Sequence, residues 1–141
     1  MEYKLTLFTS IFDNKTHKYM TFDSWDKFEK LLFELSEKPG YKAKKGENKK
    51  SSPLISPAYY FNNEKRRNVN VIGWGGWCAI DVDEYDDTFE NVLKSYKQYY
   101  YICYSTASST KEHPKFRLVF PLDRHVEKDE IKYFWFALNK E

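Results

Sequence analysis

The sequence predicts a mixed α+β domain, in which a β-α-β-β-α core follows an N-terminal α/β segment. Apolar residues alternate with a period of two in some segments and recur every three or four residues in others, which predicts both strands and helices. From residue 77 onward these patterns come in the order strand, helix, strand, strand, helix. Two aspartates lie at the end of the first of those strands, which makes this strand end the first candidate for a functional site.

The N-terminal segment is predicted to contain a strand and an amphipathic helix. Residues 3–9 alternate apolar and polar side chains, as a half-buried strand does. Asp23 or Ser24 can accept the first free N–H groups of a helix, and Pro39 with Gly40 is a common stop signal. The apolar residues between them recur at helical spacing and are expected to pack in the core: Trp25, Phe28, Leu31, Leu32 and Leu35.

Two segments of this half are predicted to be irregular. Residues 12–20 are polar and turn-like. Residues 41–52 hold five lysines and no aliphatic residue larger than alanine, which indicates a flexible loop. Such a loop is either a solvated surface segment or an arm that contacts nucleic-acid phosphates, and the sequence leaves both open. The candidate phosphate contacts are Lys44, Lys45, Lys49 and Lys50.

Prolines, arginines and glycines mark the approach to the core. Residues 53–57 begin and end with proline, which favours extended backbone. Arg66 and Arg67 follow, and they are either surface charges or bidentate ligands of phosphate groups. Three glycines then interleave with tryptophans, which indicates tight turns or close contact between backbones: Gly73, Gly75 and Gly76.

The strand that begins at residue 77 ends in two candidate metal ligands. Ile80 and Val82 alternate with Asp81 and Asp83, so the two carboxylates should share one face while the apolar residues point into a core. Neighbouring carboxylates repel each other unless a positive charge lies between them, and oxygen ligands suit Mg²⁺ or Mn²⁺. The alternative is a merely polar strand end, because this short pattern is common by chance.

The remaining elements are predicted to be a capped helix after residue 86, two strands and a final helix (residues 99–105, 115–120 and 127–139). This order is part of the split β-α-β plan of ferredoxin-like and RNA-recognition-like folds, whose last strand would follow residue 141. Lys115 and Arg117 should share one face of the third core strand, across a cleft from the aspartates. Carboxylates that face cations in this way suit phosphoryl transfer.

Composition indicates one soluble domain of 141 residues with a net charge of +2. Neither a signal peptide nor a membrane-spanning run is recognisable, so a cytoplasmic location is expected. Cys78 and Cys103 lack metal-ligand spacing and are expected to be buried thiols. The glycine patterns of P-loops and dinucleotide sites are missing from the sequence, as are the aromatic signature of RNA-recognition modules and the ligand spacing of an EF-hand.

The sequence resembles the archaeo-eukaryotic primase superfamily, and more closely the primase-polymerase domains of phage and plasmid replication proteins. The similar segments are residues 53–58, 65–71, 79–86 and, most specifically, 104–126. The resemblance implies a primase-polymerase-like fold. It also implies that Asp81 and Asp83 bind divalent metal, Mg²⁺ or Mn²⁺, and act in catalysis.

A second motif of that family, Ser-x-His or Thr-x-Ser-His, falls on residues 106–109. The resemblance therefore implies that the incoming nucleotide is bound by Ser108, Ser109, Lys115 and Arg117. Ser109 replaces the motif histidine, and a neutral hydroxyl cannot supply a cationic contact. His113 is one substitute, although a surface-turn role is its more ordinary interpretation. The family's third, acidic motif has no counterpart, as expected if this chain is the N-terminal part of a longer protein with an incomplete site.

The predicted function is metal-dependent nucleotidyl transfer on single-stranded DNA, by a primase or primase-polymerase. Its partners would be a DNA template, nucleoside triphosphates and a helicase domain or protein, with no membrane. Arg66, Arg67 and the lysine loop would contact template or nucleotide phosphates. An alternative is a non-catalytic nucleic-acid-binding replication module with the same fold, which Ser109 and the missing acid favour. A metal-dependent nuclease is a weaker interpretation.

Overall fold

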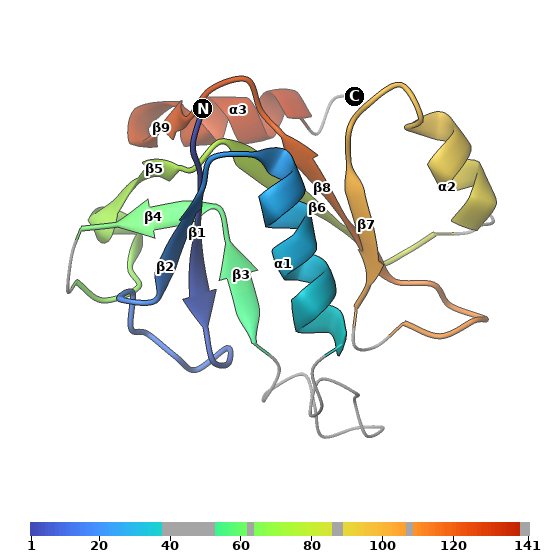
Figure 1. Cartoon of the computed structure of the whole chain (residues 1–141), viewed down its shortest axis with the longest axis horizontal. Helices are drawn as coiled ribbons and strands as arrows, with labels where there is room; N and C mark the ends of the chain where they lie inside the picture. Colours follow the sequence, from blue (N-terminus) through green and yellow to red (C-terminus); the bar gives the residue numbers. More distant parts are fainter. Residues whose placement is uncertain (38–52, 62–63, 86–88, 107–108, 139–141) are drawn as a thin grey trace.

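The computed structural model describes residues 1–37, 53–61, 64–85, 89–106 and 109–138 (Figure 1). The strands of this part are β1 (Tyr3–Phe8), β2 (Tyr19–Phe22), β3 (Leu54–Ser56), β4 (Ala58–Tyr60), β5 (Val71–Trp74), β6 (Trp77–Val82), β7 (Ile102–Ser105), β8 (Phe116–Pro121) and β9 (Val126–Glu127). The helices are α1 (Trp25–Glu37), α2 (Phe89–Ser95) and α3 (Ile131–Leu138), with 3-10 helices η1 (Asn68–Asn70) and η2 (Lys128–Glu130). The predicted α+β class is confirmed.

The N-terminal sheet has the order β2-β1-β3, and both pairs are antiparallel. β1 and α1 lie where the sequence predicts them, and Ser24 caps α1 by accepting the N–H of Lys27 at 3.3 Å. The prediction that residues 12–20 form only a turn is wrong at its end, because β2 begins at Tyr19. β2 is an edge strand with mostly exposed side chains, so no buried alternation identifies it.

The glycine-rich segment connects a second sheet, of order β4-β5-β9, to β6. Gly75 lies between two backbones: its N–H donates to the carbonyl of Pro57 at 2.8 Å, and its carbonyl accepts the N–H of Lys4 at 2.8 Å. Gly76 has a φ of +83°, which residues with a side chain rarely adopt. The predicted turn with close backbone contact is confirmed, and it brings β1 against the start of β6.

The third sheet has the order β6-β8-β7. β8 is antiparallel to both neighbours, so β6 and β7 run parallel with β8 between them, and α2 lies on the connection from β6 to β7. This is the strand order of the split β-α-β plan. The predicted order of elements from residue 77 is confirmed except at its end, where β9 and η2 come before α3 and the final helix begins at residue 131 rather than 127. Figure 1 shows α1 and α2 on either side of β7.

The two faces of this sheet pack against different elements. Trp77 is fully buried against Phe28 of α1, in the main core cluster. Leu118 and Val82 belong to a second cluster, on the opposite face. Asp81 lies four residues after Trp77 and shares its face, because side chains alternate along a strand. Asp81 therefore lies on the face of the sheet that packs against α1.

The helical stripe predicted in α1 does form core, because Phe28 is fully buried and three other members pack around it: Trp25, Leu31 and Leu32. Of the two cysteines predicted to be buried, Cys78 is buried and Cys103 is only half-buried. Burial raises the pKa of both thiols to about 11. Both therefore remain protonated near neutral pH, which makes them poor nucleophiles.

The turn between β1 and β2 is organised by Asp13. Its Oδ2 accepts the N–H and the hydroxyl of Thr9, at 2.9 and 3.1 Å, and its Oδ1 accepts the N–H of Lys15 at 3.0 Å. The backbone hydrogen bonds from Thr9 and Lys15 lower the pKa of Asp13 from 3.8 to about 2. The ionised carboxylate thus holds both sides of the turn together.

Asp13 is expected to contribute to stability above about pH 4, and this contribution should disappear as the pH falls toward about 2. The reason is that its folded-state pKa lies below its unfolded value. Asp13→Ala should lower the free energy of unfolding near neutral pH, and its difference from the parent chain should shrink in acid. Urea denaturation at several pH values measures this, with Asp123→Ala as a control. A difference that does not change with pH would contradict it.

Candidate functional site

One row of side chains crosses the third sheet near the end of β6. The antiparallel register places Asp81 opposite Arg117, and Arg117 opposite Tyr104 of β7. The guanidinium of Arg117 holds both carboxylate oxygens of Asp81, because Nε donates to Oδ1 and Nη2 donates to Oδ2 at 3.1 Å. Its Nη1 donates to the Tyr104 hydroxyl at 3.1 Å. Three strands therefore position one hydrogen-bonded row.

The polar groups of this row stabilise the positive charge of Arg117. Burial alone would lower the pKa of Arg117, but hydrogen bonds and charge from Asp81 and Tyr104 outweigh it and raise that pKa above its ordinary value. Burial raises the pKa of Tyr104, which stays a neutral hydroxyl near pH 7. The exposed fraction of the side chain is 53% for Asp81 and 24% for Arg117, so the row is most open to solvent at Asp81.

Arg117 changes how the predicted site is assembled. The sequence predicted a cleft with Asp81 on one side and Arg117 on the other, whereas the structure pairs them directly. The repulsion expected between the carboxylates of Asp81 and Asp83 is thus relieved in part by a side chain of the neighbouring strand. A metal ion at Asp81 would share the carboxylate with this guanidinium.

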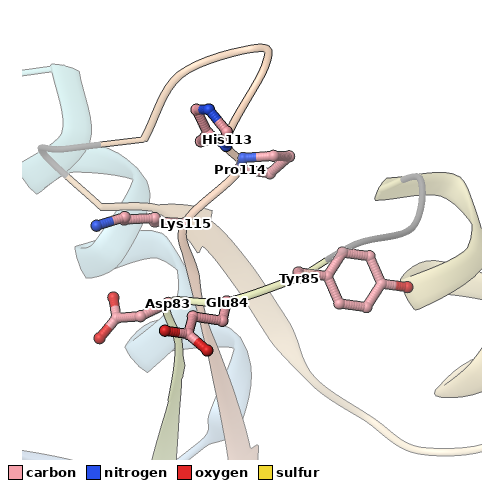
Figure 2. Close-up of a pocket in the computed structure, with 6 residues that line it drawn as sticks. All are labelled: Asp83, Glu84, Tyr85, His113, Pro114 and Lys115. Atoms are coloured by element: carbon pink, nitrogen blue, oxygen red, sulfur yellow. The ribbon is translucent and has the colours of Figure 1, made fainter.

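A cavity of about 520 Å³ lies just beyond the row, where β6 ends and the chain returns into β8. Its wall is formed by Asp83, Glu84, Tyr85, His113, Pro114 and Lys115. Figure 2 shows that the side chains of Asp83 and Lys115 extend to the same side, whereas Tyr85 extends away from them. The register of β6 and β8, continued by one residue beyond the Val82–Phe116 pair, brings Asp83 opposite Lys115. Asp81 adjoins this cavity without lining it.

The loop between β7 and β8 is closed by hydrogen bonds that present Lys115. The N–H of Thr106 donates to the Lys115 carbonyl at 2.9 Å, and the N–H of Lys115 donates to Ser109 Oγ at 2.9 Å. Ser109, a predicted nucleotide contact, therefore supports the backbone of Lys115. Ser108 lies outside the described residues. His113 is exposed and lines the cavity, which is more than the surface turn that the sequence suggested.

The predicted nucleic-acid contacts differ from one another in their surroundings. Arg66 is held at the β1–β2 turn, because its Nη2 donates to the Ile11 carbonyl at 2.6 Å and its guanidinium lies 4.6 Å from the centre of the Phe8 ring. Arg67 is exposed at the start of η1. The predicted arm, Lys44, Lys45, Lys49 and Lys50, lies outside the described residues. Of the two arginines, Arg67 is thus the more accessible to phosphate.

The metal ligands predicted from the sequence remain a pair of carboxylates, Asp81 and Asp83. In the described ranges, no three histidine, cysteine or acidic side chains gather closely enough to hold a metal ion by themselves. Sequence reasoning missed two residues at this strand end, Tyr104 and Glu84. The signal for Tyr104 was its position on the strand predicted for residues 99–105, but only the register shows that it meets Arg117.

The family described as VapE N-terminal domain matches residues 60–135, which is more than half of the chain. The matched segment includes the whole third sheet, the Asp81–Arg117 pair and the cavity. No curated protein and no solved structure matches the chain significantly. Among the helices that the structure describes, none is long and apolar enough to cross a membrane.

Proposed function

This chain belongs to the VapE N-terminal domain family, a family associated with phage and plasmid replication, and on that premise we propose that it carries out metal-dependent nucleotidyl transfer on single-stranded DNA. In this proposal the cavity at the end of β6 receives a nucleoside triphosphate. The fold would be that of a primase-polymerase, with the β6-β8-β7 sheet as its centre. The observation that carries the proposal is the composition of the cavity wall.

The cavity wall combines the charges that nucleotide chemistry needs. Its size is in the range of small-molecule sites, which are roughly 300–1,000 Å³. Asp83 and Glu84 supply carboxylates, while Lys115 supplies a cation beside them. Positioning and charge neutralisation provide most of the catalysis in phosphoryl transfer. A phosphoryl-transfer site is therefore expected to have carboxylates and a lysine at one opening.

Asp81 and Asp83 would hold Mg²⁺ or Mn²⁺. Carboxylate oxygens are ligands that these ions prefer, and Mg²⁺ needs only one or two protein carboxylates when phosphate and water complete its shell. The donor set at this strand end therefore fits the ion. When bound, the metal would neutralise phosphate charge and favour attack on the phosphoryl group.

The other side chains would bind the nucleotide or orient the metal ligands. Lys115, whose backbone is fixed by Ser109, would contact the triphosphate as a point charge. Arg117 would act as a positioning residue, because its guanidinium fixes the orientation of Asp81. His113, on the cavity wall, would supply the imidazole that is absent at Ser109.

Asp83→Asn is expected to lower nucleotide incorporation on a single-stranded template at least about 100-fold, because it removes a charged metal ligand. Primer synthesis and extension with labelled nucleotides, in Mn²⁺ or Mg²⁺, measure this. Calorimetric titration with Mn²⁺ should show weaker binding by the same variant. Asp123→Asn, at an exposed aspartate after β8, is the matched control. Unchanged incorporation in Asp83→Asn, or a parent chain that neither binds Mn²⁺ nor incorporates nucleotide, would overturn the proposal.

A second candidate is a non-catalytic nucleic-acid-binding module. The observation that favours it is the Asp81–Arg117 pair, which already neutralises one of the two predicted metal ligands. Binding of DNA that weakens with salt and ignores both divalent metal and nucleotide, in a chain without incorporation activity, would support this candidate over the first.

A further inference from the structure

A second charged surface forms where the β1–β2 turn meets the segment that follows β4, at the lower left of Figure 1. Lys15 and Lys65 form an isolated antiparallel bridge there. The N–H of Arg66 donates to the Asn14 carbonyl at 2.9 Å. The hydroxyl of Thr16 donates to a carbonyl of the same segment, that of Glu64, at 2.5 Å. We call this the basic surface, defined by Phe12, Lys15, Lys18, Phe61, Lys65 and Arg67.

Positive charge dominates the basic surface. Its exposed cations are Lys15, Lys18, Lys65 and Arg67. Arg66 adds a further charge behind them, where it packs over Phe8. The described acids nearby are Asp13, whose carboxylate is engaged by the N–H groups of its own turn, and Glu64. Five cations from two segments that are far apart in sequence therefore lie near two acids, which leaves an excess of three positive charges.

Two exposed phenylalanines belong to the same two segments as these cations. Phe12 exposes 70% of its surface and Phe61 exposes 54%. Phe12 follows Ile11, whose carbonyl is bound by Arg66, and Phe61 begins the turn that leads to Lys65. Exposed aromatic rings near cations are typical of surfaces on which bases stack while phosphates are neutralised.

We propose that the basic surface binds single-stranded nucleic acid, with its lysines and Arg67 on phosphates and its two phenylalanines stacked on bases. Unpaired bases fit better than a duplex, because rings can stack only on bases that are free to unstack from their neighbours. The proposal rests on the proposed function only in that the bound strand would be its template. Binding itself requires neither metal nor the Asp81–Arg117 pair.

Two double variants test the proposal, with a fluorescent thirty-nucleotide oligo(dT) as probe. Lys15→Gln/Lys65→Gln should weaken binding about tenfold and lower the slope of log affinity against log salt by about 1.4, since each phosphate contact contributes about 0.7. Phe12→Ala/Phe61→Ala should weaken binding about tenfold or more but leave the salt slope unchanged. Fluorescence anisotropy across several salt concentrations, with oligo(U) and duplex DNA alongside, measures both.

Matched controls lie elsewhere on the surface. Lys30→Gln/Lys94→Gln removes the same charge from exposed helix positions, and Tyr133→Ala removes a ring that is 67% exposed. Thermal unfolding verifies that the variants remain folded, and the Lys15–Lys65 bridge involves only backbone. Lack of oligo(dT) binding by the parent chain, equal losses in the controls, or tighter binding to duplex would overturn the proposal. If Asp83→Asn loses nucleotide incorporation but binds oligo(dT) as the parent chain does, the result supports the proposed role of the basic surface, because this binding does not require the metal site.

Discussion

Gly75→Ala is expected to leave the chain largely unable to hold its native fold. A Cβ at Gly75 would lie 2.4 Å from both the Cβ and the carbonyl oxygen of Lys4, and 2.8 Å from its Cα. These atoms belong to or adjoin the backbone of β1, the central strand of its sheet, so they cannot move aside cheaply. We expect a loss of at least about 3 kcal/mol, which is a large part of the stability of an ordinary domain.

Gly76→Ala provides the graded comparison. Its φ of +83° strains any residue with a Cβ, but the nearest atoms would be side-chain atoms at 3.3 Å. A cost of about 1–2 kcal/mol is therefore expected. Urea denaturation, followed by tryptophan fluorescence and by circular dichroism, gives both free energies. A Gly75→Ala chain that is as stable as Gly76→Ala would show that β1 is not packed against this turn as described.

The fold around residue 77 could be predicted because its signals are local. The alternation that ends at Val82 predicts β6, and the glycines before it predict a tight turn. The partner of Gly75 could not be predicted in the same way, because Lys4 lies far away in sequence and presents only backbone and Cβ atoms. β2 escaped prediction because edge strands with exposed side chains carry no buried alternation.

In the candidate site, the sheet face of each side chain could be predicted, whereas the register between the strands could not. Alternation along each strand places Asp81 with Asp83, and Lys115 with Arg117, on common faces. It cannot say which acid meets which cation, since a shift of two residues preserves both faces. The observed register pairs Asp81 with Arg117 and leaves Asp83 and Lys115 at the cavity. The roles of the two cations therefore differ, although the sequence treats them alike.

Substitution of Arg117 is expected to have the largest effect on activity at the candidate site outside the carboxylates. Arg117→Ala removes three hydrogen bonds, two to Asp81 and one to Tyr104. We expect nucleotide incorporation to fall at least about 100-fold, mainly through kcat, because the loss concerns the orientation of Asp81 in the transition state. The KM for nucleotide should change little if Lys115, and not Arg117, contacts the triphosphate.

Arg117→Lys separates charge from geometry. Lysine keeps the positive charge but cannot hold two carboxylate oxygens in the plane of a guanidinium, so we expect it to restore little of the activity. Tyr104→Phe should cost only a few-fold, because it removes one hydrogen bond and leaves the pair with Asp81 intact. Steady-state kinetics over nucleotide and Mn²⁺ concentration compare all three variants. If Arg117→Lys is nearly as active as the parent chain, or if Arg117→Ala acts mainly on the nucleotide KM, then Arg117 serves as a phosphate ligand and the Asp81–Arg117 pair is not what orients the carboxylate.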